Sequence, residues 1–194
     1  MSHVLGFDTS GAWCAAALWS NGAVVDAVAE EMTRGQAERL MGLLQELLAR
    51  HDLGWRDLDA LGVGVGPGNF TGIRIGVSAA RGLALGLDVP AYGVTGFEQR
   101  KDLQAHPLYV PAPRESVYVM QADGPALVTR AELEADGTAL PADPAPAELA
   151  RAIASHAAGL YPQIAPPPAP YYLRPADAAP GRDLPPVILP SDAP

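Results

Sequence analysis

Gly66-Pro-Gly-Asn-Phe-Thr-Gly-Ile-Arg-Ile-Gly-Val-Ser-Ala-Ala-Arg-Gly-Leu-Ala-Leu-Gly86 is the stretch that decides the fold of this 194-residue chain. It opens with a Gly-Pro-Gly turn. Apolar side chains then recur at helical spacing, at Ile73, Val77, Ala80 and Ala84. Asn69 or Thr71 can cap the start of such a helix by accepting hydrogen bonds from its free backbone N–H groups. The stretch therefore predicts a tight turn followed by a helix.

Glycines interrupt the predicted helix at intervals that leave one face smooth. A glycine inside a helix costs about 1 kcal/mol relative to alanine, so a packing or functional reason is expected for each. Gly72, Gly76 and Ala80 are spaced by four and form a ridge that another backbone can approach closely. Two interpretations remain open: the helix presses onto its own sheet, or it packs tightly against a partner.

The first half of this stretch resembles a family signature. Residues 66–76 are similar to the G-P-G-S-F-T-G-[LVI]-R-I-G motif of the bacterial TsaB (YeaZ) family. The matching residues are Gly66, Pro67, Gly68, Phe70, Thr71, Gly72, Arg74 and Gly76. Members of that family are subunits of the machinery that places threonylcarbamoyl on adenosine 37 of certain transfer RNAs. The resemblance covers residues 3–121 well, and residues 122–194 only through Tyr172-Leu-Arg174.

The residues before the motif predict three strands and a helix. Apolar runs at 4–7, 12–19 and 23–31 are joined by tight turns, and Asn21-Gly22 is a strong hairpin signal because both residues tolerate positive φ. Thr33-Arg-Gly-Gln36 has the form of a capping box, and a stripe of leucines follows to about Arg50. The sequence therefore predicts a meander followed by an amphipathic helix.

The elements around and after the motif complete an α/β fold. A buried strand is expected at 58–65, a further strand at 89–94, and a helix from Gly96 to about Ala105 with Thr95 as its cap. Three antiparallel strands followed by helix, strand, helix, strand, helix is the order of the RNase H-like unit in the actin/sugar-kinase/Hsp70 superfamily. The family resemblance implies the same fold.

The composition changes after His106-Pro107, and this predicts a domain boundary. We expect residues 1–106 to form the RNase H-like domain, 107–174 a smaller degenerate α/β domain, and 175–194 a Pro-rich tail. Within the second domain the expected elements are strands at 108–110, 116–121, 126–128 and 170–174 and a helix at 147–158. The tail has too little apolar surface to order itself firmly, although Val187-Ile-Leu189 could dock on a neighbour.

Charge and cysteine content restrict the function classes. The formal charge is −9, and a chain this acidic is poorly suited to hold a phosphate backbone, because such binding relies on Lys and Arg. Any contact with transfer RNA is therefore expected to be indirect. Cys14 is the only cysteine, and there is no signal-peptide pattern or apolar run long enough to span a membrane. These features predict a cytoplasmic location.

The loop Asp8-Thr9-Ser10 follows the first strand, where the superfamily places its first phosphate loop. An Asp there can hold hydrated Mg²⁺, and the hydroxyls and turn N–H groups can bind phosphate. Asp8, Thr9 and Ser10 can equally form a structural Asx-type turn between two strands. The second phosphate loop of relatives reads D-A-R-x-x-E-V-Y, but here Pro111 replaces the acid and removes a backbone N–H. We therefore expect no firmly bound cofactor, and ATP or ADP with Mg²⁺ only within a complex.

Other catalytic patterns are not found in the sequence. The catalytic paralogue TsaD holds its metal with an H-x-x-x-H pair on its first helix, whereas the corresponding helix here contains no His before His51. The four histidines are scattered singly, so no metal site is expected. Cys14 lies mid-strand, Ser78 lies within the glycine-ridged helix, and no G-x-S-x-G motif is present. We expect no catalytic residue.

The resemblance also implies an interaction surface. In the family, the leucine-striped and glycine-ridged helices pair with the matching helices of TsaD, or with a second copy of themselves when TsaD is absent. The expected interface residues are Leu40, Leu44, Leu47, Gly72, Ile73, Gly76, Val77 and Arg81.

The function that follows from the resemblance is that of a non-catalytic subunit. It would bind and activate TsaD, together with the ATPase TsaE, while a TsaC-type enzyme supplies threonylcarbamoyl-adenylate. The alternatives are a small-molecule kinase or ATPase of the actin-like superfamily acting through Asp8, and a self-contained metallopeptidase.

Overall fold

The computed structural model describes residues 2–173, and its main body is a five-stranded sheet ordered β3-β2-β1-β4-β5. Strands β1 (His3–Asp8), β2 (Trp13–Ser20) and β3 (Ala23–Glu31) are antiparallel, whereas β4 (Ala60–Gly64) and β5 (Ala91–Val94) continue the sheet in parallel. Asn21 and Gly22 have φ of 50° and 101°, which confirms the predicted hairpin turn. This mixed α/β sheet confirms the expected RNase H-like fold class.

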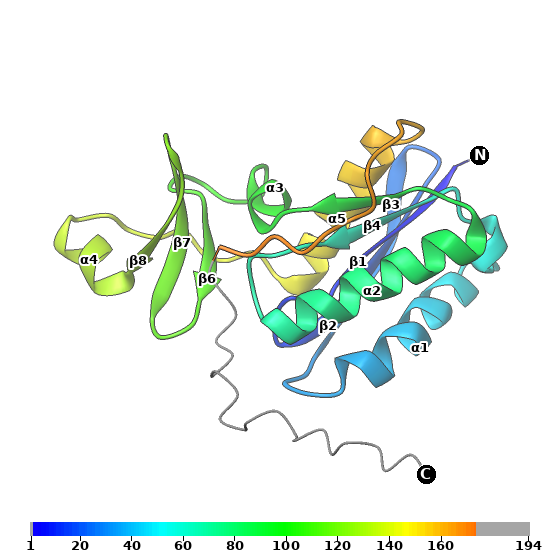
Figure 1. Ribbon diagram of the computed structural model, residues 1–194, viewed down its shortest axis with the longest axis horizontal. Helices are drawn as coiled ribbons and strands as arrows, with labels where there is room; N and C mark the ends of the chain where they lie inside the picture. Colours follow the sequence, from blue (N-terminus) through cyan, green and yellow to red (C-terminus); the bar gives the residue numbers. More distant parts are fainter. Residues whose placement is uncertain (1, 174–194) are drawn as a thin grey trace, which may run out of the picture.

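Two helices cover one face of the sheet and one covers the other (Figure 1). Helices α1 (Gln36–Ala49) and α2 (Phe70–Leu87) lie side by side on the first face, and a 3₁₀ turn at Trp55–Asp57 leads from α1 into β4. The main core fills the space between these helices and the sheet, with Leu5, Phe7, Leu61 and Val63 from the strands. Strands β1 and β4 are almost wholly buried because both of their faces are covered.

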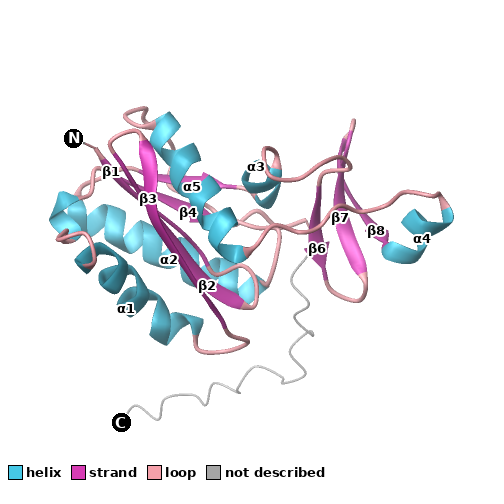
Figure 2. Cartoon of the chain, turned by 180° about the vertical axis from the view of Figure 1, so that it is seen from behind, coloured by secondary structure: helices cyan, strands magenta, loops and turns pink. Residues whose placement is uncertain are grey.

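Helix α5 (Pro146–Leu160) covers the opposite face, as Figure 2 shows from behind. Its Ala150 and Ala154 pack against Ala15 and Ala17 of β2, and these small side chains let the helix lie close to the sheet. The helix predicted at 147–158 is therefore confirmed. However, it belongs to the first sheet, whereas the sequence-based division placed it in the second domain.

A separate three-stranded antiparallel sheet is formed by β6 (Tyr109–Ala112), β7 (Ser116–Gln121) and β8 (Gly124–Thr129). Helix α4 (Arg130–Ala135) follows it. This helix was not among the expected elements, although Thr129 and Glu132 form its capping box. The segment from residue 165 to 173 then returns beside the first sheet, and Tyr171 N–H donates to the Val65 carbonyl at 2.7 Å. No strand forms at 170–173, contrary to expectation, and Arg174 and the tail lie outside the described residues.

An ion pair between a buried arginine and an exposed aspartate links the helix after β5 to the loop before α5. Arg100, at the end of α3 (Gly96–Arg100), is 3% exposed, and its Nε donates to Asp143 Oδ1 at 2.7 Å. Its Nη2 donates to the other carboxylate oxygen at 3.2 Å and its Nη1 to the Gly96 carbonyl at 3.0 Å. Asp143 lies just before α5, so this pair fixes the loop that returns from the small sheet to the main one.

Three helix starts show where local signals predicted the cap correctly and where they did not. Asn69 Oδ1 accepts from Gly72 N–H at 2.9 Å, which confirms the predicted cap of α2. Thr95 caps α3 as predicted, although that helix ends at Arg100 rather than near Ala105. The capping box predicted at Thr33 is wrong: Gly35, with φ of 91°, precedes α1 without any side-chain cap.

Candidate functional site

The Asp8 loop is held entirely by the chain's own groups. Asp8 is completely buried, and its carboxylate accepts hydrogen bonds from Ser10 N–H at 3.2 Å, Ser10 Oγ at 3.0 Å and Trp13 Nε1 at 2.8 Å. Thr9 Oγ1 donates to the Gly72 carbonyl at 2.7 Å. The indole ring of Trp13 also lies against Gly11, where any Cβ would overlap it. This geometry is an Asx-type turn, the structural alternative to a phosphate loop. Both Asp8 carboxylate oxygens already accept hydrogen bonds.

The second expected phosphate loop forms a tight hairpin between β6 and β7. Pro111 lies within β6, paired with Val117, and Arg114 and Glu115 make the turn with φ of 61° and 52°.

Among residues 2–173 there is no group of three or more His, Cys, Asp or Glu side chains that could hold a metal ion. Burial raises the pKa of the Cys14 thiol to about 11, so this thiol stays protonated at neutral pH.

The glycine ridge of α2 faces the Asp8 loop and the sheet. A Cβ on Gly72 would overlap the Thr9 carbonyl oxygen, and a Cβ on Gly76 would lie 2.9 Å from Thr9 Oγ1 and 3.3 Å from Val63 Cγ2. Ala80 is buried in the same core. Of the two interpretations of the ridge, the structure supports the one in which the helix presses onto its own sheet.

Most of the residues expected at the partner interface are therefore misassigned. Their side chains lie in the chain's own core, where they are at most 4% exposed, and they are Leu40, Leu44, Leu47, Ile73 and Val77. Gly72 and Gly76 are buried as well. Arg81 is the exception, because it is exposed on α2. A single sequence shows the apolar stripe of a helix but not how much of that stripe its own sheet covers.

The surface that α1 and α2 do expose is a shallow apolar groove between them, with a volume of about 420 Å³. Met41, which is 42% exposed, and Ala37 line it from α1. The residues that line it from α2, on the side of the helix away from the glycine ridge, are Thr71, Arg74, Ile75, Ser78 and Ala79. Leu40, one of the residues expected at the partner interface, is buried at the bottom of this groove.

Two motif residues connect α2 to the C-terminal segment. The Phe70 ring stacks on Tyr172 with centroids 4.7 Å apart and planes 26° apart, and Arg74 Cζ lies 3.9 Å from the Phe70 centroid. Arg74 Nε also donates to Tyr172 Oη at 3.1 Å. Sequence analysis did not assign this contact, because the partners are 98 residues apart in the chain.

No helix within residues 2–173 is long and apolar enough to cross a membrane.

Comparison with known proteins places the chain in a family. The family model described as TsaD, tRNA N6-adenosine threonylcarbamoyltransferase, matches residues 26–134, which is more than half of the chain. The tRNA threonylcarbamoyladenosine biosynthesis protein TsaB of Escherichia coli (strain K12) is 40% identical over 93 residues. That match covers 48% of this chain and 40% of the Escherichia coli protein, so it spans well under half of the relative's length.

Two solved structures are similar in fold. YeaZ from Pseudomonas aeruginosa superposes with a TM-score of 0.53 at 29% identity, over 66% of this chain and 65% of that one. An uncharacterized protein described as similar to peptidase YEAZ from Pseudomonas aeruginosa gives a TM-score of 0.65 at 24% identity, over 90% of this chain and all of the other. The second likeness concerns the fold alone. With the family model covering more than half of its length, and with TsaB and YeaZ proteins among its relatives, the chain belongs to the TsaD family and, within it, to the TsaB (YeaZ) group that the Gly66–Gly76 motif predicted.

Proposed function

We propose that this chain is a non-catalytic subunit in the synthesis of threonylcarbamoyladenosine at position 37 of the transfer RNAs that read codons beginning with A. In this proposal it binds and activates TsaD through the surface of α1 and α2, and it contacts transfer RNA only indirectly. TsaE completes the assembly, and a TsaC-type enzyme supplies the activated threonylcarbamoyl group.

The observation that carries the proposal is the α1–α2 groove. It is apolar, it lies on the outer side of the two helices, and Met41 and Ile75 are available in it for a partner helix. Partially exposed apolar side chains gathered in one groove are typical of protein interaction sites. The relatives named TsaB and the TsaD family model supply the identity of the proposed pathway.

The state of the Asp8 loop supports a subunit without its own chemistry. A carboxylate that already accepts from Ser10 and Trp13 must give up these bonds before it can hold hydrated Mg²⁺. Thr9 is likewise engaged with Gly72. An actin-like kinase or ATPase acting through Asp8 therefore requires this loop to rearrange, which disfavours that alternative.

Reconstitution of the modification tests the function. Unmodified transfer RNA, threonine, bicarbonate and ATP are incubated with TsaD, TsaE and a TsaC-type enzyme, with and without this chain, and modified adenosine is quantified. We expect product only when the chain is present, and no ATP turnover by the chain alone. Equal product without it, or steady ATP hydrolysis by the isolated chain, contradicts the proposal.

A pair of surface variants tests the interface. Met41→Glu puts a charge into the groove, and we expect TsaD binding to weaken at least about tenfold, because a central interface residue contributes more than about 1.4 kcal/mol. Val25→Glu is the matched control, since Val25 is 47% exposed on the edge strand β3. Val77 is unsuitable as the test position, because it lies in the core and a glutamate there would unfold the chain. Equal TsaD affinity of folded Met41→Glu and Val25→Glu would remove α1 from the interface.

A further inference from the structure

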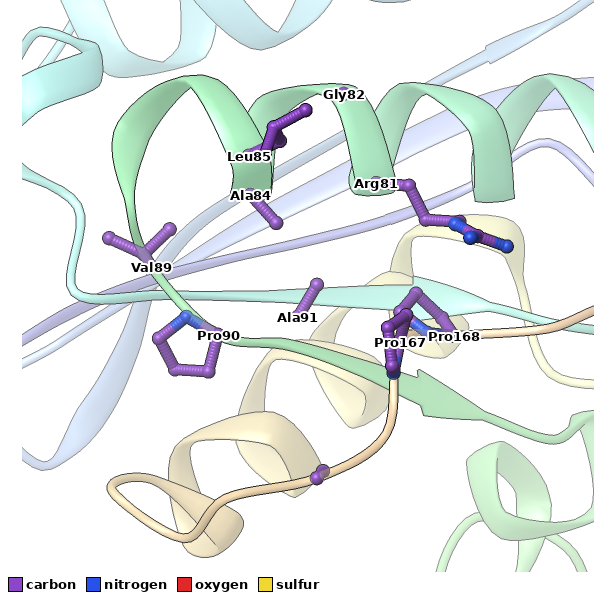
Figure 3. Close-up of a pocket in the computed structure, with 10 residues that line it drawn as sticks. Arg81, Gly82, Ala84, Leu85, Val89, Pro90, Ala91, Pro167 and Pro168 are labelled. Atoms are coloured by element: carbon purple, nitrogen blue, oxygen red, sulfur yellow. The ribbon is translucent and has the colours of Figure 1, made fainter.

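A second groove lies at the C-terminal end of α2 and shares no lining residue with the α1–α2 groove. It has a volume of about 510 Å³ and runs between the last turns of α2, strand β5 and the returning C-terminal segment. Figure 3 shows Ala84 and Leu85 on the helix, Pro90 and Ala91 at the start of the strand, and Pro167 and Pro168 on the segment opposite. The walls are mostly apolar, and Arg81 adds a charged group to them.

Two side chains at this groove are without a partner in residues 2–173. Leu85 is 87% exposed and lies at the rim of the groove, on the outer side of α2. Arg81, one turn earlier, is exposed and makes no ion pair within the described part of the chain. An occupant of this groove would need apolar side chains beside Leu85 and a carboxylate beside Arg81.

We propose that the occupant is this chain's own segment Asp183–Asp192, with Val187-Ile-Leu189 in the apolar part of the groove and an aspartate beside Arg81. The segment lies outside the described residues, and its sequence supplies the required chemistry. Val187, Ile188 and Leu189 are three consecutive large apolar residues, flanked at a distance by Asp183 and Asp192. From 183 to 194 the sequence contains no Lys or Arg, so its charge is opposite to that of Arg81.

The connection is long enough for this docking. The described chain ends at Leu173, next to Tyr172, which stacks on Phe70 at the first turn of α2. From Phe70 to Leu85 the helix rises about 22 Å, at about 1.5 Å per residue. The 14 residue steps from Leu173 to Val187 reach about 43 Å as polyproline II, at about 3.1 Å per residue. The segment can therefore turn back along α2 and reach the groove with chain to spare.

Attachment to the same chain makes even a weak contact effective. A flexible connection of this length gives an effective concentration in the millimolar range, so a segment that binds weakly as a free peptide is held in place when linked. Docking would cover Leu85 and leave the α1–α2 groove open, because the two grooves share no lining residue. The inference therefore does not depend on the proposed function.

Paramagnetic relaxation in the full chain tests the proposal. A nitroxide is attached at Ser191→Cys in the ¹⁵N-labelled protein. Cys14 is buried with its pKa raised to about 11, so the wild-type chain serves as the control for selective labelling. We expect the amide signals of Gly82, Leu85 and Ala91 to lose intensity, while those of α4, at the far end of the molecule (Figure 1), keep theirs. Uniform signals, or losses confined to another surface, overturn the proposal.

Two further measurements separate the occupants. In a mixture of spin-labelled unenriched chain and unlabelled ¹⁵N chain, the groove signals should be unaffected; losses there mean that the groove binds a second copy, which overturns docking in cis. Arg81→Glu should lower the ratio of docked to undocked segment about fivefold, the effect of losing one exposed ion pair at the strong end of the range. Arg56→Glu, at an exposed position outside the groove, is the matched charge reversal and should change nothing. Equal effects of the two reversals count against the assigned contact.

Discussion

Gly72 is the position where the packing of α2 on the Asp8 loop can be tested most directly. In Gly72→Ala the new methyl group overlaps the Thr9 carbonyl oxygen, so the helix or the loop must move. Overpacking of this kind costs about 1–3 kcal/mol, and loss of the bond from Thr9 Oγ1 to the Gly72 carbonyl adds about 1 kcal/mol. The higher helix propensity of alanine offsets about 1 kcal/mol of this loss in the free energy of unfolding. The net expectation is a loss of about 2 kcal/mol, or roughly 4–8 °C in Tm for a chain of this size.

The same helix offers its own control. Gly82→Ala places a methyl group where no atom lies within 4 Å, so we expect a gain of up to about 1 kcal/mol. Gly76→Ala should fall between the two, since its Cβ would meet the Thr9 hydroxyl at 2.9 Å, a contact that can relax. Urea unfolding followed by circular dichroism and tryptophan fluorescence gives the three free energies of unfolding. If Gly72→Ala unfolds at the same urea concentration as Gly82→Ala, the close approach of α2 to the loop is not what requires glycine.

Three other outcomes follow from buried and paired charges. Asp8→Asn should lower the free energy of unfolding by about 1–3 kcal/mol in urea, because the amide brings a donor to a site already filled with donors. Cys14 should react with a thiol reagent at pH 8 orders of magnitude more slowly in the native chain than in urea, since burial raises its pKa to about 11; equal rates would mean that the site opens readily. Hydrogen bonds from Arg39 lower the pKa of Glu30 and of Glu46 below the ordinary 4.5. The stability that this network contributes is therefore present above pH 4.5 and lost as the pH falls through the lower folded values, and Arg39→Met should flatten that acid limb of the stability profile.

Sequence patterns were sufficient where the determining interactions are local. The positions of the first five strands along the chain, the Asn21-Gly22 hairpin and the Asn69 cap depend on residues close in the sequence, and the structure confirms them. The capping box at Thr33 failed although it is also local. A glycine in a left-handed conformation starts α1 instead, and Gln36 Nε2 donates to the Met32 carbonyl rather than back to a cap.

The chemistry of the Asp8 loop could be narrowed from sequence but not decided. The residue types allow either a phosphate loop or an Asx-type turn, and only the partners of the side chains separate the two. Those partners include the Trp13 indole and the Gly72 carbonyl, and the second lies 63 residues from Thr9. In the same way the Phe70–Tyr172 stack joins the family motif to a segment that the sequence analysis treated as a separate strand.

By itself, the sequence determined the family, the α/β class and the amphipathic nature of α1 and α2, because a long motif and the period of apolar residues are properties of the chain alone. Only the tertiary structure decided which side of each helix stays exposed and that α5 closes the back of the first sheet. The physical reason is that burial is a property of pairs of surfaces. Leu44 and Ile73 lie under the chain's own sheet while Met41 and Leu85 face solvent, and the apolar pattern of a helix is the same in both cases.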